Sequence, residues 1–123
     1  MRILCIDDDD ILLLMLARLL ERRGHVVTKA ESGEQGLERL RADPAAQDLV
    51  LTDFNLPGMS GIEVAHAVRL IRPDLRVAVA SGYLSQDLKA KAQAAGVIDL
   101  IFKPDTVGEY CDAVERLAAP PPV

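Results

Sequence analysis

The stretch LVLTDFNLPGMSG, residues 49–61, decides the fold because it joins an apolar run, an acid and a tight turn. The run at 48–52 has three consecutive apolar residues, 49–51, which is typical of a strand covered on both faces, as in parallel sheets. Asp53 stands directly after this predicted strand. Pro57-Gly58 and Gly61 then let the chain turn tightly. We therefore expect a parallel strand that delivers the Asp53 carboxylate to the loop at its end.

The same pattern recurs on both sides of this stretch. Four more short apolar runs alternate with segments of helical periodicity, whose ends are marked by glycine, proline and aspartate. Five strand–helix units with right-handed crossovers form an open, doubly wound α/β sheet with helices on both faces. We expect one domain over 1–118 and a short proline-rich tail over 119–123. The predicted strands are 2–6, 25–29, 48–52, 75–80 and 97–102, and the predicted helices are 10–23, 33–42, 61–72, 84–95 and 106–118.

Composition narrows the class of protein. The 123 residues suit a single domain, and the 50% hydrophobic content excludes disorder. Cys5 and Cys111 are too few for a disulfide scaffold and are not clustered as a zinc site requires. The net charge of −5 leaves no basic footprint for direct nucleic-acid binding. The apolar run 11–20 is too short to span a bilayer and follows four aspartates, so we expect no direct membrane contact and a cytoplasmic location.

Polar residues follow four of the five predicted strands. The carboxyl ends of parallel strands form the binding edge of an open sheet, so we expect these residues to converge. Crowded carboxylates repel one another unless a cation joins them, and Mg²⁺, or Mn²⁺ in its place, suits oxygen ligands of this kind. A carboxylate nucleophile with a metal, a lysine and a hydroxyl predicts an aspartyl-phosphate site. The residues are Asp7 and Asp8, Asp53 and Asn55, Ser81, and Lys103.

Four motifs resemble the receiver domain of bacterial two-component response regulators: IDDD at 6–9, the stretch at 49–61, ASG at 80–82 and FKP at 102–104. The resemblance covers essentially the whole chain. It implies a flavodoxin-like (βα)5 fold with strand order 2-1-3-4-5. It also implies a phosphoacceptor that takes its phosphoryl group from the phosphohistidine of a sensor kinase or phosphotransfer protein. Such a domain later hydrolyses its own phosphate and turns over no separate substrate, so it is not an enzyme in the ordinary sense.

The resemblance also implies a role for each site residue. Asp53 would be the phosphoacceptor, Ser81 would hydrogen-bond the phosphoryl group, and Lys103 would pair with it. The Lys103–Pro104 bond resembles a cis peptide of the family that aims the lysine.

The resemblance further implies a Mg²⁺ site. Asp8, the side chain of Asp53 and the backbone carbonyl of Asn55 would bind the ion directly, while Asp7 would act chiefly through water. Backbone N–H groups near Phe54 and Gly82 would complete the oxygen contacts.

Three positions depart from the family pattern. Leu100 occupies the place of an aromatic residue whose ring moves inward when the hydroxyl engages the phosphoryl group, and Asp105 follows Lys103-Pro104 in place of an apolar residue. Tyr83 either substitutes for the missing ring or is a half-exposed loop residue. We interpret Phe102 as a core residue of the last strand.

The function classes still open follow from these departures. The chain resembles either a stand-alone receiver or one excised from a hybrid kinase or phosphorelay. One alternative is a pseudo-receiver that only docks onto partners, although both the acceptor and the acid pair are kept. The other is a small Mg²⁺-dependent phosphatase with an aspartate nucleophile, which needs a second acid where Asn55 stands.

The first predicted helix suggests a partner surface. Asp9 and Asp10 begin it, because acids favour the positive end of the helix dipole. Its periodicity predicts that one stripe faces the sheet, which leaves Leu13, Leu14 and Ala17 outward as a docking surface for the histidine-bearing helices of a kinase. We expect a monomer or weak dimer. The predicted inward stripe is Leu12, Met15, Leu16, Leu19 and Leu20.

Overall fold

A computed structural model describes residues 1–96 and 99–118 of the chain. Strands and helices alternate in the order predicted, and all five strands run parallel in the order β2-β1-β3-β4-β5. The fold class and strand order expected from the sequence are therefore confirmed. The elements are β1 (Arg2–Ile6), α1 (Asp10–Arg22), β2 (Val26–Ala30), α2 (Gly33–Ala42), β3 (Leu49–Asp53), α3 (Gly61–Ile71), β4 (Arg76–Ser81), α4 (Gln86–Ala94), β5 (Asp99–Phe102) and α5 (Val107–Ala118).

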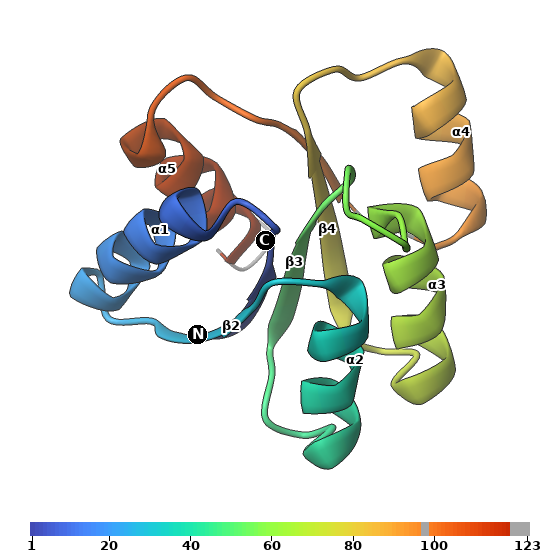
Figure 1. Ribbon diagram of the computed structural model, residues 1–123, viewed down its shortest axis with the longest axis horizontal. Coiled ribbons are helices and arrows are strands. Elements are labelled where there is room, and N and C mark those ends of the chain that lie inside the picture. Colours follow the sequence, from blue (N-terminus) through green and yellow to red (C-terminus); the bar gives the residue numbers. More distant parts are fainter. Residues whose placement is uncertain (97–98, 119–123) are drawn as a thin grey trace, which may run out of the picture.

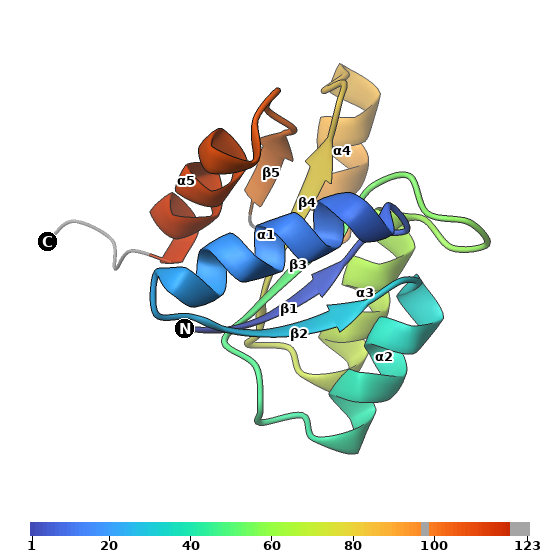
Figure 2. The same ribbon diagram turned by 60° about the vertical axis from the view of Figure 1, so that its left-hand side comes forward.

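The helices divide between the two faces of the sheet. Figures 1 and 2 show α1 and α5 together on one face, and α2, α3 and α4 on the other. One apolar cluster lies under α1 and α5 and includes Ile3, Leu16 and Val114, all fully or almost fully buried. A second lies under α2 and α3 and includes Leu4 and Val68. Successive residues of β1 thus point to opposite faces, which is why its sequence is continuously apolar.

Strands β2, β3 and β4 begin and end about one residue later than their sequence patterns predict. The β3–β4 ladder runs on until Asp53 pairs with Ala80, and the β4–β5 ladder until Ser81 pairs with Phe102. Both polar residues are therefore held by strand backbone. Residues 97–98, the predicted start of the fifth strand, lie outside the described residues, as does the predicted tail at 119–123.

The helices begin where the sequence provides caps. Asp9 caps α1 by accepting a hydrogen bond from the backbone N–H of Leu12 at 3.1 Å. Serine side chains cap the next three helices in the same way. Because the cap of α4 is Ser85, this helix begins at Gln86, later than the predicted start at residue 84. These serine caps are Ser32, Ser60 and Ser85.

The orientation predicted for α1 was wrong for Leu13, Ala17 and Met15, whereas Leu12, Leu16, Leu19 and Leu20 pack inward as predicted. Leu13 and Ala17, predicted to face outward, are buried with Leu16 and Leu20 at the i, i+3, i+4, i+7 spacing of one helix face. Met15, predicted to face the sheet, is half exposed. Leu14 does lie outward, as do Ile11 and Met15, so the exposed apolar residues of α1 are Ile11, Leu14 and Met15.

Phe102 is also placed differently from its prediction as a core residue. It lies on the edge strand β5, and its side chain is 58% exposed. Ile101 before it is buried under α1 and α5, whereas Leu100 only partly packs against the other cluster. Tyr83 is a largely exposed loop residue.

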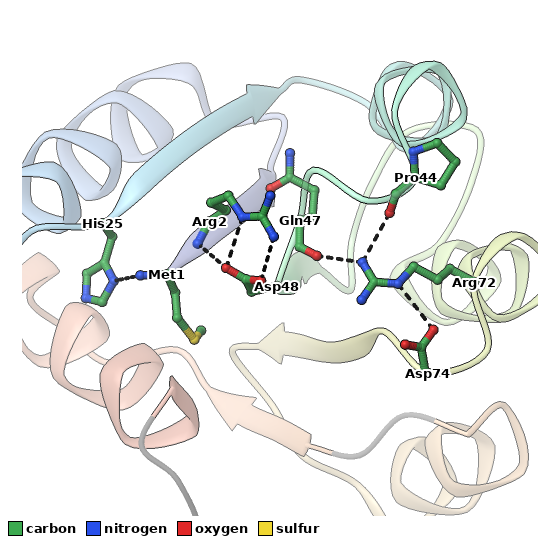
Figure 3. A network of polar contacts seen from close by, with 8 residues as sticks. All are labelled: Met1, Arg2, His25, Pro44, Gln47, Asp48, Arg72 and Asp74. Carbon is green, nitrogen blue, oxygen red and sulfur yellow. Dashed lines mark hydrogen bonds and ion pairs between the residues drawn. The ribbon is translucent and has the colours of Figure 1, made fainter.

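Hydrogen bonds and ion pairs of charged side chains connect the loops at the amino edge of the sheet, where the parallel strands begin (Figure 3). Arg72, at the end of α3, donates to the backbone carbonyls of Pro44 at 3.1 Å and Gln47 at 2.7 Å, and to Asp74 at 3.2 Å. It thereby joins the loop before β3 to the loop before β4. The other contacts in Figure 3 join Arg2 to Asp48 and the amino terminus of Met1 to His25.

No described helix is both long and apolar enough to cross a membrane.

Candidate functional site

Three carboxylates meet at the carboxyl edge of the sheet, where the parallel strands end. Asp7 and Asp8 follow β1, and Asp53 is the last residue of β3, the neighbouring strand. One oxygen from each lies within 4.8 Å of the others. Asp7 and Asp53 are only 5% and 8% exposed, whereas Asp8 is open to solvent. The convergence predicted from the sequence is therefore present, with one acid available from outside.

Lys103 supplies a positive charge to this cluster. It follows β5, and its Nζ lies 3.0 Å from Asp7 Oδ2 and 3.3 Å from Asp53 Oδ1. Burial acts to lower the pKa of Lys103, but the hydrogen bond it donates to Asp7 and the charges of Asp7 and Asp53 outweigh this effect and raise that pKa. The lysine therefore stays charged and holds the two acids together.

One lysine does not balance three acids. Burial, aided by the charges of Asp7 and Asp8, raises the pKa of Asp53 despite the opposing effect of Lys103. The ionised form of Asp53 is thus less favourable than that of an ordinary aspartate, and added positive charge would stabilise it. A cluster of hard oxygen donors with surplus negative charge fits a divalent cation such as Mg²⁺. Asn55 lies on the exposed loop after Asp53, beside these acids in sequence.

Ser81 ends β4 next to Asp53, but its hydroxyl is already engaged. Its Oγ donates to the backbone carbonyl of Tyr83 at 2.9 Å and accepts from the Tyr83 backbone N–H at 3.2 Å. It also lines a hollow of about 280 Å³ together with Phe54, Asn55 and Tyr83. Ser81 is therefore near the acids, and it must exchange a bond to Tyr83 before it can donate elsewhere.

The loop after Asp53 is shaped by two glycines. Gly58 has a positive φ of +78°, a conformation that favours glycine. A Cβ on Gly61 would lie 2.9 Å from Phe54 Cα and closer still to the Asp53 carbonyl oxygen. Its own N–H donates to the Phe54 carbonyl at 2.9 Å, so the start of α3 packs directly against the backbone of Asp53.

Two details expected from the family resemblance were wrong. The described residues contain no cis peptide bond, so the Lys103–Pro104 bond is trans. The lysine is aimed instead by the β4–β5 ladder, because its backbone N–H donates to the Ser81 carbonyl at 2.8 Å. The N–H of Phe54 is not free for an oxygen ligand, since it donates to the Ala80 carbonyl at 2.8 Å.

The sequence reasoning missed Tyr110. It lies on α5, and its ring is buried under α1 beside the site, where it shares a small cavity with Asp7. The sequence feature that could have indicated it is a single tyrosine on the inward face of α5, beside the apolar positions Cys111 and Val114.

A buried carboxylate flanked by two acids, a lysine and a hydroxyl lies at the carboxyl edge of this doubly wound sheet, the arrangement expected from the resemblance to receiver domains. Comparison with known proteins agrees. The family model for the response regulator receiver domain matches residues 3–115. The chain belongs to the receiver domains of two-component response regulators, as the sequence motifs indicated.

Two curated relatives and one solved structure are similar to this chain over nearly their whole length, whereas other relatives match over as little as 27% of theirs. The response regulator receiver protein CpdR of Brucella abortus is 31% identical over 116 residues, covering 94% of this chain and 95% of CpdR. Sporulation initiation phosphotransferase F of Bacillus subtilis is 29% identical over 115 residues, covering 94% and 91%. The crystal structure of TrrA from Thermotoga maritima, in complex with Mg²⁺ and BeF, has a TM-score of 0.78 at 28% identity, covering 94% and 97%.

Proposed function

We propose that this receiver domain accepts a phosphoryl group from a phosphohistidine onto the carboxylate of Asp53, with Mg²⁺ bound by the neighbouring acids. The observation that carries the proposal is the juxtaposition of buried Asp53 with Asp7, Asp8 and Lys103. The similarity to sporulation initiation phosphotransferase F supports transfer of a phosphoryl group, within a phosphorelay in this proposal, and the Mg²⁺ and BeF in the TrrA structure support a metal-assisted acceptor.

Transfer needs little covalent work from the protein. A carboxylate oxygen of Asp53 forms a bond to phosphorus while the bond between phosphorus and the histidine nitrogen breaks, and the imidazole leaves with that electron pair. Catalysis of such a transfer is mostly positioning and charge neutralisation. Lys103 contributes by leaving Asp53 for a phosphoryl oxygen, and Ser81 by exchanging its bond to Tyr83 for another phosphoryl oxygen. Hydrolysis of the acyl phosphate later restores Asp53, so no separate substrate is turned over.

The acids would hold the metal in this scheme. Asp8 and Asp53 would bind it directly with the carbonyl of Asn55, and Asp7 would act chiefly through water. The donor set fits because all its members offer oxygen and because the acids carry more charge than Lys103 balances. When bound, the ion neutralises charge that builds up on the phosphoryl oxygens. Mn²⁺ would serve in its place.

The donor must approach along α1. Asp53 opens only at the carboxyl edge, and the first turns of α1 lie beside that edge with Ile11, Leu14 and Met15 exposed. We propose these residues, in place of the Leu13, Leu14 and Ala17 set, as the surface that meets the helix bearing the phosphohistidine. A cytoplasmic location, no direct nucleic-acid or membrane partner, and a monomer or weak dimer remain part of the proposal.

Phosphate incorporation tests the proposal. The parent protein is incubated with radiolabelled acetyl phosphate and Mg²⁺, and the acid-stable, base-labile label on the protein is measured. Asp53→Asn should incorporate none, whereas Asp48→Asn, a change to an aspartate at the amino edge, should be labelled like the parent. Equal labelling of Asp53→Asn and the parent would refute the assignment of the acceptor.

The docking surface is tested separately, with the cognate kinase or phosphotransfer protein as donor. Leu14→Glu combined with Met15→Glu should slow uptake from that donor and leave uptake from acetyl phosphate unchanged. Arg18→Glu, on the same exposed side of α1 but farther from the site, is the matched control. Uptake from the protein donor at the parental rate in the double variant would exclude this surface.

A further inference from the structure

Tyr110 brings a polar group to the buried side of the acidic cluster. It lies in the second turn of α5 and is 3% exposed, packed in the cluster that contains Cys5, Leu13 and Leu51. A phenylalanine or leucine would fill the same apolar space without a hydroxyl. Buried tyrosine hydroxyls usually form a hydrogen bond, so we expect an acceptor or a water close to the Tyr110 hydroxyl.

A small cavity beneath Asp7 shows which partner is within reach. It has a volume of about 10 Å³, and its walls include Asp7, Tyr110, Cys5 and Leu51. Asp7 and Tyr110 provide its ionisable oxygen groups, and the remaining walls are apolar or thiol. A space of this size is about that of one water molecule. Tyr110 and Asp7 line this space together, with no direct hydrogen bond between them, so one water in it would bridge the phenol and the carboxylate.

Asp7 has capacity for a further donor. Its Oδ1 accepts from the backbone N–H of Asp9 at 3.0 Å, and its Oδ2 accepts from Lys103 Nζ at 3.0 Å. Each carboxylate oxygen has two lone pairs, so one on each remains. The phenol of tyrosine ordinarily has a pKa of about 10. The phenol thus keeps its proton at neutral pH and remains a donor.

We infer that Tyr110 is a positioning residue for the metal site: its hydroxyl donates to Asp7 through one water and fixes that carboxylate toward Asp8 and Asp53. This inference rests on the metal-dependent function proposed above. Lys103 cannot remain hydrogen-bonded to Asp7 in the phosphorylated state, because it would then pair with the phosphoryl group. Tyr110 is anchored in the core of α5 and holds Asp7 in both states.

Metal affinity is the first test. Isothermal titration calorimetry measures Mg²⁺ binding to the parent, Tyr110→Phe and Tyr110→Leu. Removing an outer partner of a metal site typically weakens binding by about 10- to 100-fold. Because Asp7 acts on the ion chiefly through water, we expect the lower end, about a 10-fold loss, in Tyr110→Phe, whose ring still fills the core. Tyr110→Leu should lose no less. An affinity of Tyr110→Phe equal to that of the parent would overturn the inference, since only packing would then be needed.

Fluorescence without metal provides the second test, independent of Mg²⁺ binding. The chain has two tyrosines and no tryptophan, so Tyr83→Phe leaves Tyr110 as the sole emitter. A carboxylate that accepts a hydrogen bond from an excited phenol quenches its emission. In the Tyr83→Phe background with chelator present, Asp7→Asn should therefore brighten Tyr110, and Asp105→Asn, which changes an exposed acid, should not.

The two tests fail in different ways. Equal emission with and without Asp7→Asn would overturn the contact between Tyr110 and Asp7. Absence of Mg²⁺ binding in the parent would instead refute the metal site proposed above, and the fluorescence comparison would still decide whether Tyr110 contacts Asp7.

Discussion

The two edges of the same sheet treat charge in opposite ways. At the amino edge, arginines meet acids and peptide carbonyls: Arg2 lies 3.0 Å from Asp48, and Arg72 donates to two loop carbonyls and an aspartate. These contacts lower the pKa of Asp48, chiefly through its hydrogen bond with the Arg2 side chain. At the carboxyl edge, three acids crowd around one lysine, and the pKa of Asp53 is raised, chiefly by burial.

This difference separates stability from function within one small domain. The amino edge is complete as it stands, and its charges join loops that would otherwise be held only by the strands. The carboxyl edge holds more negative charge than Lys103 balances. A bound cation would neutralise the excess, and Lys103 would then be available to pair with a phosphoryl group. Sites of this kind reduce stability, and the rest of the fold must compensate. The predictions below change one edge at a time.

Adding Mg²⁺ should have the largest effect, because a cation would complete the carboxyl edge as the arginines complete the amino edge. At a concentration 100 times the dissociation constant, binding to the native state alone adds about 2.7 kcal/mol to the free energy of unfolding. Urea denaturation with Mg²⁺ and with chelator measures this difference. Asp8→Asn should lose most of the gain. A parent protein whose unfolding is the same in both conditions would show that this edge is not waiting for a cation.

Gly61→Ala should come next, because the new Cβ would collide with the backbone of Asp53 and Phe54. Overpacking of this kind costs about 1–3 kcal/mol of stability, and it should also slow phosphate incorporation by displacing the acceptor. Gly108→Ala is the matched control, since nothing lies within 4 Å of its added Cβ in α5. Thermal denaturation should show a melting temperature well below that of the parent for Gly61→Ala. The melting temperature of Gly108→Ala should be close to or above that of the parent.

Arg72→Ala should destabilise the amino edge without touching the site. It leaves the carbonyls of Pro44 and Gln47 without this donor, a loss of about 1–2 kcal/mol. Phosphate incorporation by the folded protein should stay at the parental level. Arg41→Ala, which truncates an exposed arginine of α2, is the control for denaturation. If Arg72→Ala also abolished phosphate uptake in folded protein, the two edges would not be separable.

The pH dependence of Asp53→Asn should show the smallest effect. The folded pKa of Asp53 is raised above its ordinary value of 3.8, so the native state binds its proton more tightly than the unfolded state. Parental stability should therefore fall as pH rises from that ordinary value through the raised one, and this contribution disappears in Asp53→Asn. Metal-free urea denaturation across this range should show the variant gaining on the parent as pH rises. A constant difference between the two would indicate that Asp53 titrates at its ordinary value.

Much of the fold was predictable because its information is local. Continuous apolar strands, glycine and proline at helix ends, and polar residues after the strands defined the sheet and its active edge. The structure brings Asp7, Asp8, Asp53 and Lys103 together there, with Ser81 adjacent. The strand ends were misjudged by about one residue, because ladder pairing extends through Asp53 and Ser81.

The errors concern features that depend on tertiary contacts. Residues 11–17 are all apolar, so periodicity does not fix which side of α1 faces inward, and contact with α5 decides that Leu13 and Ala17 are buried. Phe102 resembles a core residue in sequence, but its strand lies at the edge of the sheet. Tyr110 contacts the site from an element 57 positions after Asp53 in the chain, a proximity that only the folded structure reveals.

The small buried surface of α4 has a consequence for the loop that holds Ser81. Only Leu88 and Ala92 of its nine residues are buried, and it follows directly on the loop whose hydrogen bonds occupy Ser81. Segments with so little buried surface open at a small free-energy cost while the rest of the domain stays folded. Backbone amides of α4 should therefore exchange with deuterium well before those of β1 or β3. A local opening equilibrium thus lies beside the hydroxyl that would sense the phosphate.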